Sequence, residues 1–271
     1  MTFLHKLEKE QVKNNSLLCI GLDPDFINLP DRFQKTLHPQ FTFNKWIIDQ
    51  TKDLVCCYKP NSAFYEARGA DGISELKDTC DYIHEKAPSV PVLLDFKRGD
   101  IGNTNSAYAK FAFEYLDVDA VTLQPYQGIE ALQPFLDYKN KGIFILCKTS
   151  NPGSEELQDV SIVAGLATTL YQHVARQVLT KWNANKNCLL VVGATYPDQL
   201  SKVRKLVGDM TILVPGIGSQ GGDLEKTLKA GLANDKRGLI INSSRSIIFS
   251  DDPRKEAQKM KSSINLLQNQ H

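Results

Sequence analysis

The sequence repeats one pattern along its length: a short apolar run ends in polar or glycine-rich residues, and a stretch with helical spacing follows. Eight apolar runs show this pattern, at 17–22, 54–58, 90–96, 120–123, 143–147, 188–192, 211–214 and 238–241. Nearly continuous apolar runs are typical of strands that are buried on both faces of a parallel sheet. We therefore expect eight parallel strands.

Helical patterns lie between these runs. Residues 73–87 place Ile73, Leu76, Cys80 and Ile83 at helical spacing, and further patterns lie at 106–115, 129–138, 162–182, 199–207, 224–231 and 253–267. Strand-then-helix units repeated through 271 residues predict an α/β protein with a (β/α)₈ (TIM) barrel, as a single domain over residues 1–271. The alternative, a doubly wound open sheet, usually has fewer strands per domain. The long excursion at 150–162 is a candidate mobile lid.

Composition excludes several classes of protein. The 32 Lys and Arg residues nearly balance the 31 Asp and Glu residues, so the net charge of +1 gives no sign of a nucleic-acid-binding surface. No stretch has the apolar length of a membrane span, and the N-terminus becomes charged before the apolar region of a secretory signal could form. The six cysteines form no C-x-x-C pair, so we expect reduced thiols in a cytoplasmic protein without membrane or nucleic-acid partners.

Charged residues follow two neighbouring strands, at the end of a barrel where active sites lie. Asp95 and Lys97 are two residues apart on a strand, so their side chains point to the same face, and Asp100 follows in the next loop. Lys59 ends the preceding strand. Two lysines and two aspartates could therefore alternate in sign, which favours the charged form of Lys97 and suits a reaction that creates negative charge beside an ammonium. The alternative is a structural ion pair at the barrel mouth.

A second group of candidates follows the last two strands. The loop at 215–222 (PGIGSQGG) precedes a helix, and residues 242–245 (NSSR) end the eighth strand, where barrels commonly bind phosphate through backbone N–H groups. Arg245 could add a bidentate contact. Gly216, Gly218 and Gly221 also match G-x-G-x-x-G, but the match lies near the C-terminus and the next strand ends in Asn242, which disfavours a dinucleotide site.

Metal and nucleophile signals are weak. The five histidines do not pair at ligand spacing, and the sequence contains neither H-E-x-x-H nor G-x-S-x-G. We therefore expect no metal site and no cofactor.

These motifs resemble one known family. Residues 95–104 (DFKRGDIGNT) closely match the D-x-K-x-x-D-I-x-x-T signature of the orotidine 5′-phosphate decarboxylases, and the segments 21–24 (GLDP), 59–61 (KPN), 148–152 (KTSNP) and 215–220, with Arg245, follow in the expected order. The TSNP segment is similar to the branch found in many bacteria and some protozoa. The D-x-K-x-x-D core alone is shared with relatives that act on sugar phosphates.

The resemblance implies a role for each matching residue. Lys97 would stabilise a carbanion at C6 and donate the proton that replaces CO₂, Asp95 would lie against the departing carboxylate, and Lys59 and Asp100 would complete a charged tetrad. The remaining matches would bind the rest of the nucleotide: the ribose by Asp23 and Asn61, the pyrimidine by Thr149 or Ser150, and the phosphate by Pro215, Gly218, Gln220, Ser244 and Arg245. Asp100, Ile101 and Thr104 would reach into the site of the partner subunit in a homodimer.

The implied activity is the cofactor-independent conversion of orotidine 5′-phosphate to uridine 5′-phosphate (UMP) and CO₂, the last step of UMP synthesis. Only about sixteen residues precede the first strand, so we expect a free-standing decarboxylase rather than one fused to a phosphoribosyltransferase. Another branch places a tyrosine in the phosphate loop, and this loop has none. Two alternatives are a sugar-phosphate aldolase, isomerase or decarboxylase on the same barrel, and a non-catalytic pyrimidine-nucleotide binder.

Overall fold

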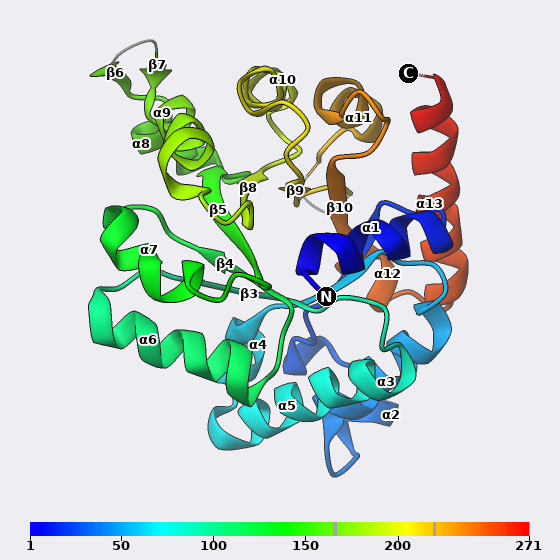
Figure 1. Cartoon of the computed structure of the whole chain (residues 1–271). Helices are drawn as coiled ribbons and strands as arrows, with labels where there is room; N and C mark the ends of the chain where they lie inside the picture. Colours follow the sequence, from blue (N-terminus) through cyan, green and yellow to red (C-terminus); the bar gives the residue numbers. More distant parts are fainter. Residues whose placement is uncertain (165–166, 219–220, 271) are drawn as a thin grey trace.

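The computed structural model, which describes residues 1–164, 167–218 and 221–270, forms a barrel of eight parallel strands surrounded by helices (Figure 1). The barrel strands are β1 (Leu18–Leu22), β2 (Cys57–Pro60), β3 (Leu93–Arg98), β4 (Ala120–Leu123), β5 (Gly142–Lys148), β8 (Cys188–Val192), β9 (Ile212–Val214) and β10 (Leu239–Ser243). They pair in the order β2-β1-β10-β9-β8-β5-β4-β3. Two parallel bridges, Tyr58–Val92 and Asn61–Asp95, join β2 to β3, so the ring is nearly closed and the predicted (β/α)₈ barrel is confirmed.

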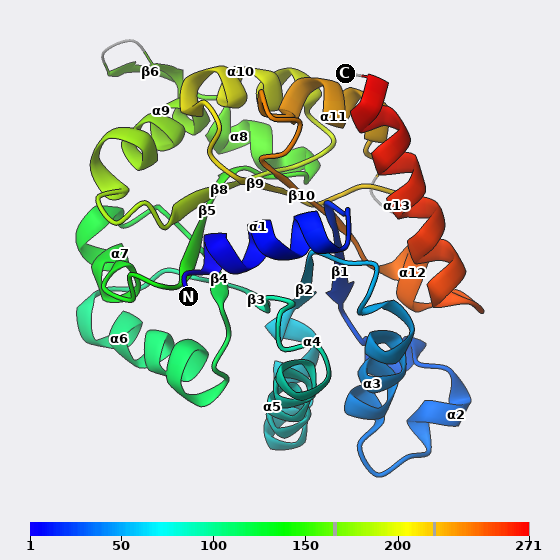
Figure 2. The same ribbon diagram turned by 45° about the vertical axis from the view of Figure 1, so that its right-hand side comes forward.

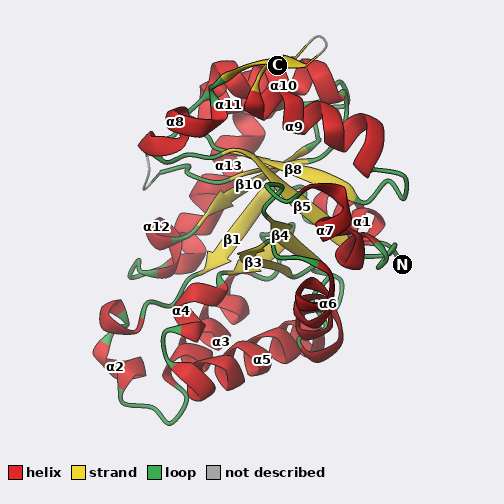
Figure 3. Cartoon of the chain, turned by 90° about the vertical axis from the view of Figure 1, so that its left-hand side faces the viewer, coloured by secondary structure: helices red, strands yellow, loops and turns green. Residues whose placement is uncertain are grey.

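Helices surround the ring, as Figures 2 and 3 show from two further directions. They are α1 (Phe3–Lys13), α2 (Asp31–Gln34), α3 (Pro39–Thr51), α4 (Ser62–Glu66), α5 (Gly69–Lys86), α6 (Gly102–Lys110), α7 (Gly128–Leu136), α8 (Glu155–Gln158), α9 (Leu170–Gln177), α10 (Pro197–Val207), α11 (Leu224–Gly231), α12 (Arg245–Ile248) and α13 (Pro253–Gln270). Two π-helical segments, at Phe111–Tyr115 and Val178–Trp182, extend α6 and α9, and short 3₁₀ turns lie at Phe26–Asn28 and Pro152–Ser154. The larger apolar core lies between strands and helices.

A second apolar core fills the inside of the barrel, and α1 covers one end of it. Phe3 and Leu7 of α1 belong to the same buried cluster as strand residues such as Phe144, and the rings of Phe3 and Phe144 meet edge to face at 5.6 Å. The side chain of Gln11 donates to the carbonyl of Leu239, at the start of β10. Helix α1 therefore closes the end of the barrel at which the strands begin.

The structure corrects the predicted helix over 162–182. Residues Ser161–Ala164 and Ala167–Thr169 form an antiparallel pair, β6 and β7, and the helix begins only at Leu170. The β-branched residues Ile162 and Val163 favour a strand over a helix, because their side chains are restricted in the helical conformation. The sequence patterns also missed α1 and α3, while the predicted excursion at 150–162 contains α8 and a 3₁₀ turn.

All six cysteines are buried and unpaired, as the sequence predicted. Burial raises the pKa of the Cys147 and Cys188 thiols to about 12. None of the helices in the described part of the chain is long and apolar enough to cross a membrane.

The contact between α1 and the barrel interior predicts a large stability loss for Phe3→Ala. Phe3 is almost fully buried, and removing a buried phenyl ring costs about 3 kcal/mol or more. The free energy of unfolding in urea should fall by that amount, whereas Val12→Ala, on the exposed side of α1, should change it little. A loss below about 1 kcal/mol in Phe3→Ala would show that α1 does not seal the core.

Candidate active site

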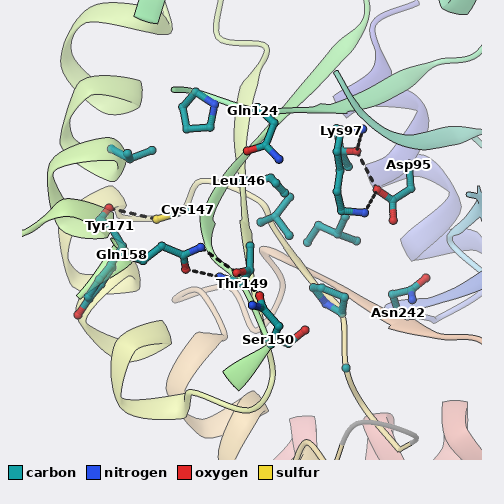
Figure 4. A pocket seen from close by; sticks show the side chains of 18 of the residues that line it. Asp95, Lys97, Gln124, Leu146, Cys147, Thr149, Ser150, Gln158, Tyr171 and Asn242 are labelled. Atoms are coloured by element: carbon teal, nitrogen blue, oxygen red, sulfur yellow. Dashed lines mark hydrogen bonds and ion pairs between the residues drawn. The ribbon is translucent and has the colours of Figure 1, made fainter. Parts of the chain in front are cut away.

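A cavity of about 780 Å³ opens at the end of the barrel where the strands finish (Figure 4). Its floor is apolar and includes Leu146, Val191 and Leu213 from the barrel interior. The predicted site residues that line it are Asp23, Lys59, Asn61, Asp95, Lys97, Thr149, Ser150, Pro215, Ser244 and Arg245. The barrel therefore brings together predicted site residues from six of its strands or the loops after them.

The centre of the site is the carboxylate of Asp95. Lys59 Nζ lies 2.8 Å from Asp95 Oδ2, and Lys97 Nζ lies 2.5 Å from Asp95 Oδ1. The hydroxyl of Thr122 on β4 also donates to Asp95 Oδ1, at 2.8 Å. Lys59 is almost completely buried, whereas the Lys97 side chain is 44% exposed. One ammonium is thus part of the wall, and the other is accessible to a ligand.

An irregularity in β3 places Lys97 at this position. The register between β3 and β4 shifts between Leu94 and Arg98, and Lys97 adopts a φ of 44°, in the left-handed region that L-residues seldom enter. The backbone N–H of Lys97 donates to the Thr122 hydroxyl at 3.1 Å. A side chain of β4 therefore supports the unusual backbone of β3, as is common where strain is retained at a functional site.

Burial and charge act in opposite directions on the pKa values of this cluster. Burial favours the neutral form of Asp95, but Lys59 and Lys97 outweigh it and hold the pKa of Asp95 well below its usual range. Burial also opposes the charged form of Lys59, yet Asp95 and Asp23 raise its pKa above the ordinary lysine value. Asp95 and Lys59 are therefore both charged at neutral pH.

A second polar group lies where β1 meets β10. Ser244 Oγ donates to Asp23 Oδ2 at 2.7 Å, and no room exists for a side chain at Gly21, whose added Cβ would lie 2.8 Å from Ser244 Cβ. Asp23 Oδ1 and Asn242 Oδ1 are buried and accept no hydrogen bond from the described residues. Both residues line the cavity, so these oxygens can receive hydroxyl or N–H donors from a ligand.

Asp100, Ile101, Thr104 and Gly218 do not line this cavity, and Gln220 lies outside the described residues. Asp100 Oδ1 instead accepts a hydrogen bond from the backbone N–H of Ile101 at 2.7 Å, and Ile101 is exposed. Within one chain, the alternating array predicted from sequence therefore consists of three residues, without Asp100.

Thr122 was not predicted from the sequence, and Asn242 was predicted only as part of the candidate segment 242–245, without a role of its own. Each is a polar residue within or next to an apolar strand, and both are buried at the barrel mouth. The sequence signal for Thr122 was that it is the one polar residue in the apolar run 120–123. Among the described residues, no group of three or more His, Cys, Asp or Glu side chains is arranged to hold a metal ion.

A parallel eight-stranded barrel whose strand ends carry a lysine–aspartate–lysine cluster defines the class: a TIM-barrel protein with a polar, charged site at its C-terminal mouth. Residues 16–260 match the model of the orotidine 5′-phosphate decarboxylase / HUMPS family.

Sequence and structure comparisons agree with this family. Orotidine 5′-phosphate decarboxylase of Cellvibrio japonicus is 50% identical over 254 residues, which cover 93% of this chain and 91% of the relative. The structure of Leishmania donovani OMP decarboxylase superposes with a TM-score of 0.89 at 40% identity, covering 99% of this chain and 100% of the other. A putative orotidine-monophosphate decarboxylase from Toxoplasma gondii gives 0.92 at 39% identity, with coverages of 99% and 97%. The chain belongs to the orotidine 5′-phosphate decarboxylase family and is a carboxy-lyase.

The charge cluster predicts how Asp95 titrates. Because its pKa is lowered on folding, the carboxylate contributes stability above its unfolded pKa of about 4, and this contribution is lost as the pH falls towards the folded value. Lys59→Met removes one of the two cations that oppose burial, so the pKa of Asp95 should rise. Carboxyl-carbon NMR titration measures this directly.

Lys6→Met is the matched control, since it breaks the Lys6–Asp119 ion pair at the other end of the barrel. The Asp95 titration should not move in this variant. If Asp95 titrates at the same pH in Lys59→Met as in the wild type, Lys59 is not what keeps it charged.

Proposed function

We propose that the enzyme converts orotidine 5′-phosphate to UMP and CO₂ without a metal ion or an organic cofactor, as the last step of de novo UMP synthesis. The observation that carries this proposal is the Lys59–Asp95–Lys97 cluster, held within hydrogen-bond distance at the barrel mouth. Relatives named orotidine 5′-phosphate decarboxylase, at up to 50% identity, support the choice of substrate. The whole chain, residues 1–271, would act as one barrel domain.

In the proposed reaction, the bond between C6 and the carboxyl carbon breaks, and its electron pair stays on C6. The accessible ammonium of Lys97 stabilises this developing negative charge and donates a proton to C6, so the products are UMP and CO₂ and Lys97 regains a proton from solvent. Asp95 would lie beside the substrate carboxylate, where two negative charges disfavour the bound substrate relative to the transition state. Lys59 holds Asp95 in place.

The remaining residues would bind the nucleotide away from C6. Asp23 and Asn61 would accept hydrogen bonds from the ribose hydroxyls. Asp23 Oδ1 is available for this, since it accepts no hydrogen bond from the described residues. Thr149 or Ser150 would contact the pyrimidine. The loops after β9 and β10 would hold the phosphate, through Pro215, Gly218, Gln220, Ser244 and Arg245. Binding energy from the phosphate can then be used to lower the barrier at the distant base.

We further infer a homodimer that shares its active sites. Asn105 fixes the loop that carries Asp100, because its Oδ1 accepts a hydrogen bond from the backbone N–H of Asp100 at 3.1 Å. This loop does not line the cavity of its own chain. Ile101 on this loop and Tyr126 on the next are large apolar side chains exposed to solvent. Exposure of large apolar side chains on two loops that follow neighbouring strands suits a subunit interface. Asp100, Ile101 and Thr104 would then complete the partner's site.

The alternatives differ in what they predict for catalysis. A sugar-phosphate enzyme of the same barrel group would not consume orotidine 5′-phosphate, and a non-catalytic binder would bind UMP without turnover. The loss of substrate absorbance after mixing, measured with and without EDTA, separates the decarboxylase from both alternatives, and UMP binding separates the alternatives from each other. We expect turnover that EDTA does not change, by an enzyme that works in the cytoplasm with no nucleic-acid or membrane partner.

Lys97→Ala should abolish nearly all decarboxylation while the protein still folds. An oriented charge of this kind lowers the barrier by about 3 kcal/mol or more, which corresponds to a loss of at least about 100-fold in kcat. The exposed Lys229 offers a matched control, because Lys229→Ala removes the same charge away from the cavity and should leave kcat unchanged. More than a few per cent of wild-type kcat in Lys97→Ala would mean that Lys97 is not the proton donor.

The shared site predicts complementation between two inactive variants, Lys97→Ala and Asp100→Ala. In a mixed dimer one site collects both defects and the other collects none. Random 1:1 exchange makes half of the dimers mixed, so about a quarter of all sites become intact and activity should rise to about a quarter of wild type. Verified mixed dimers that stay inactive would place Asp100 in the site of its own subunit, and a fully active monomer in sedimentation would rule out sharing.

A further inference from the structure

A second charged lysine is buried near the cavity but outside the catalytic cluster. Lys148 is the last residue of β5, and none of its side chain is exposed. Its Nζ donates to Ser154 Oγ and to Asp159 Oδ2, each at 2.9 Å, and lies 4.3 Å from the centre of the Tyr196 ring. Burying an ammonium is costly unless it is paired. Here its hydrogen-bond partners come from the loop that follows the same strand.

These contacts close the loop 149–159 into a ring. Lys148 holds the far end of the loop through Asp159, and the adjacent Gln158 binds back to its first residue. Gln158 Oε1 accepts from the backbone N–H of Thr149 at 2.8 Å, and Gln158 Nε2 donates to Thr149 Oγ1 at 2.8 Å. Figure 4 shows Gln158, Thr149 and Ser150 together at the edge of the cavity. Both ends of the loop are therefore fastened next to the strand.

The next loop of the barrel holds Ser150 from the other side. Thr195 Oγ1 donates to the carbonyl of Ser150 at 3.1 Å. Ser150 also packs so closely on Gly193 that a Cβ added there would lie 2.7 Å from Ser150 Cα. The two candidate pyrimidine contacts are thus held by neighbours on two sides, with the buried Lys148 ion pair at the base of the loop.

We propose that Lys148 is a positioning residue, whose ion pair with Asp159 locks the loop 149–159 and presents Thr149 and Ser150 to the base of the substrate. This inference rests on the proposed function, which places Thr149 or Ser150 at the pyrimidine. A loop that is already ordered in the free enzyme loses little conformational entropy when the substrate binds, so its affinity for the substrate is higher. Lys148 touches no group of the Lys59–Asp95–Lys97 cluster, so its loss should act on substrate binding more than on the chemical step.

Lys148→Met tests this role by removing the charge while keeping an unbranched apolar side chain. The partly exposed Asp159, at 28%, can then remain hydrated, so the variant leaves no fully buried lone charge. We expect amide hydrogen exchange in 149–159 to accelerate at least about 10-fold, because the loop opens locally without global unfolding. KM for orotidine 5′-phosphate should rise at least about 10-fold, with a smaller change in kcat.

Lys6→Met again serves as the control, because it breaks an ion pair of 2.8 Å at the opposite end of the barrel. Exchange in 149–159 and KM should both stay at wild-type values in this variant. If Lys148→Met does not fold, Asp159→Asn and Ser154→Ala remove the same contacts one at a time and should produce the same effects on exchange and KM.

Three results would overturn the proposal. Unchanged exchange in 149–159 would show that Lys148 does not lock the loop. Faster exchange with wild-type KM would show that the lock does not serve the site, and equal rises of KM in Lys148→Met and Lys6→Met would indicate general destabilisation. A wild-type protein that does not decarboxylate orotidine 5′-phosphate would instead overturn the proposed function and the positioning role with it, while the exchange comparison would still decide whether Lys148 locks the loop.

Discussion

The pairing of one buried carboxylate with two lysines is the interaction on which the site depends. Asp95 stays ionised in a mostly buried position because Lys59 and Lys97 surround it, and the buried Lys59 is in turn kept charged by Asp95 and Asp23. Removing Asp95 leaves the buried ammonium of Lys59 without its closest counter-charge, which costs more than the pair contributes. Strands β2, β3 and β4 therefore have to hold these groups within hydrogen-bond distance of one another.

The barrel supplies this rigidity through its interior. Leu146, Val191 and Leu213 form the floor of the cavity and belong to the same buried cluster as Phe3 of α1. One apolar core thus joins the helix at one end of the barrel to the active site at the other. Close-packed interiors transmit small displacements, so the packing beneath the floor helps to keep the charged groups in register.

The barrel and most of the cavity could be predicted from the sequence, because continuous apolar runs and the motifs after them are local signals. Lys59, Asp95 and Lys97 meet as the order of the strands predicted, although an irregularity in β3, and not regular strand alternation, places Lys97 there. The β6–β7 pair was missed because the stretch 162–182 has helical spacing but also contains Ile162 and Val163, which favour a strand. Spacing alone does not show which of these two signals prevails. Helix α3 was missed because its apolar residues do not form a narrow stripe.

Other features depend on contacts that no sequence pattern shows. The positive φ of Lys97 requires the hydroxyl of Thr122 from a neighbouring strand, and the burial of Lys148 requires Asp159, which comes eleven residues later. Such pairs are specified by tertiary structure, and each looks unremarkable in its own segment. The role of Asp100 is harder still to read, because its carboxylate does not line the cavity of its own chain.

The closure of the ring has a consequence for how the protein is made. Strand β1 pairs with β2 on one side and with β10 on the other, and the hydrogen bond between Asp23 and Ser244 joins residues 221 positions apart. On the ribosome, β1 emerges early, but one of its edges stays open until the last strand has been synthesised. A nascent chain therefore carries Lys59, Asp95 and Lys97 before the barrel is sealed, and the corner at which Asp23 meets Ser244 forms only after β10 has been synthesised.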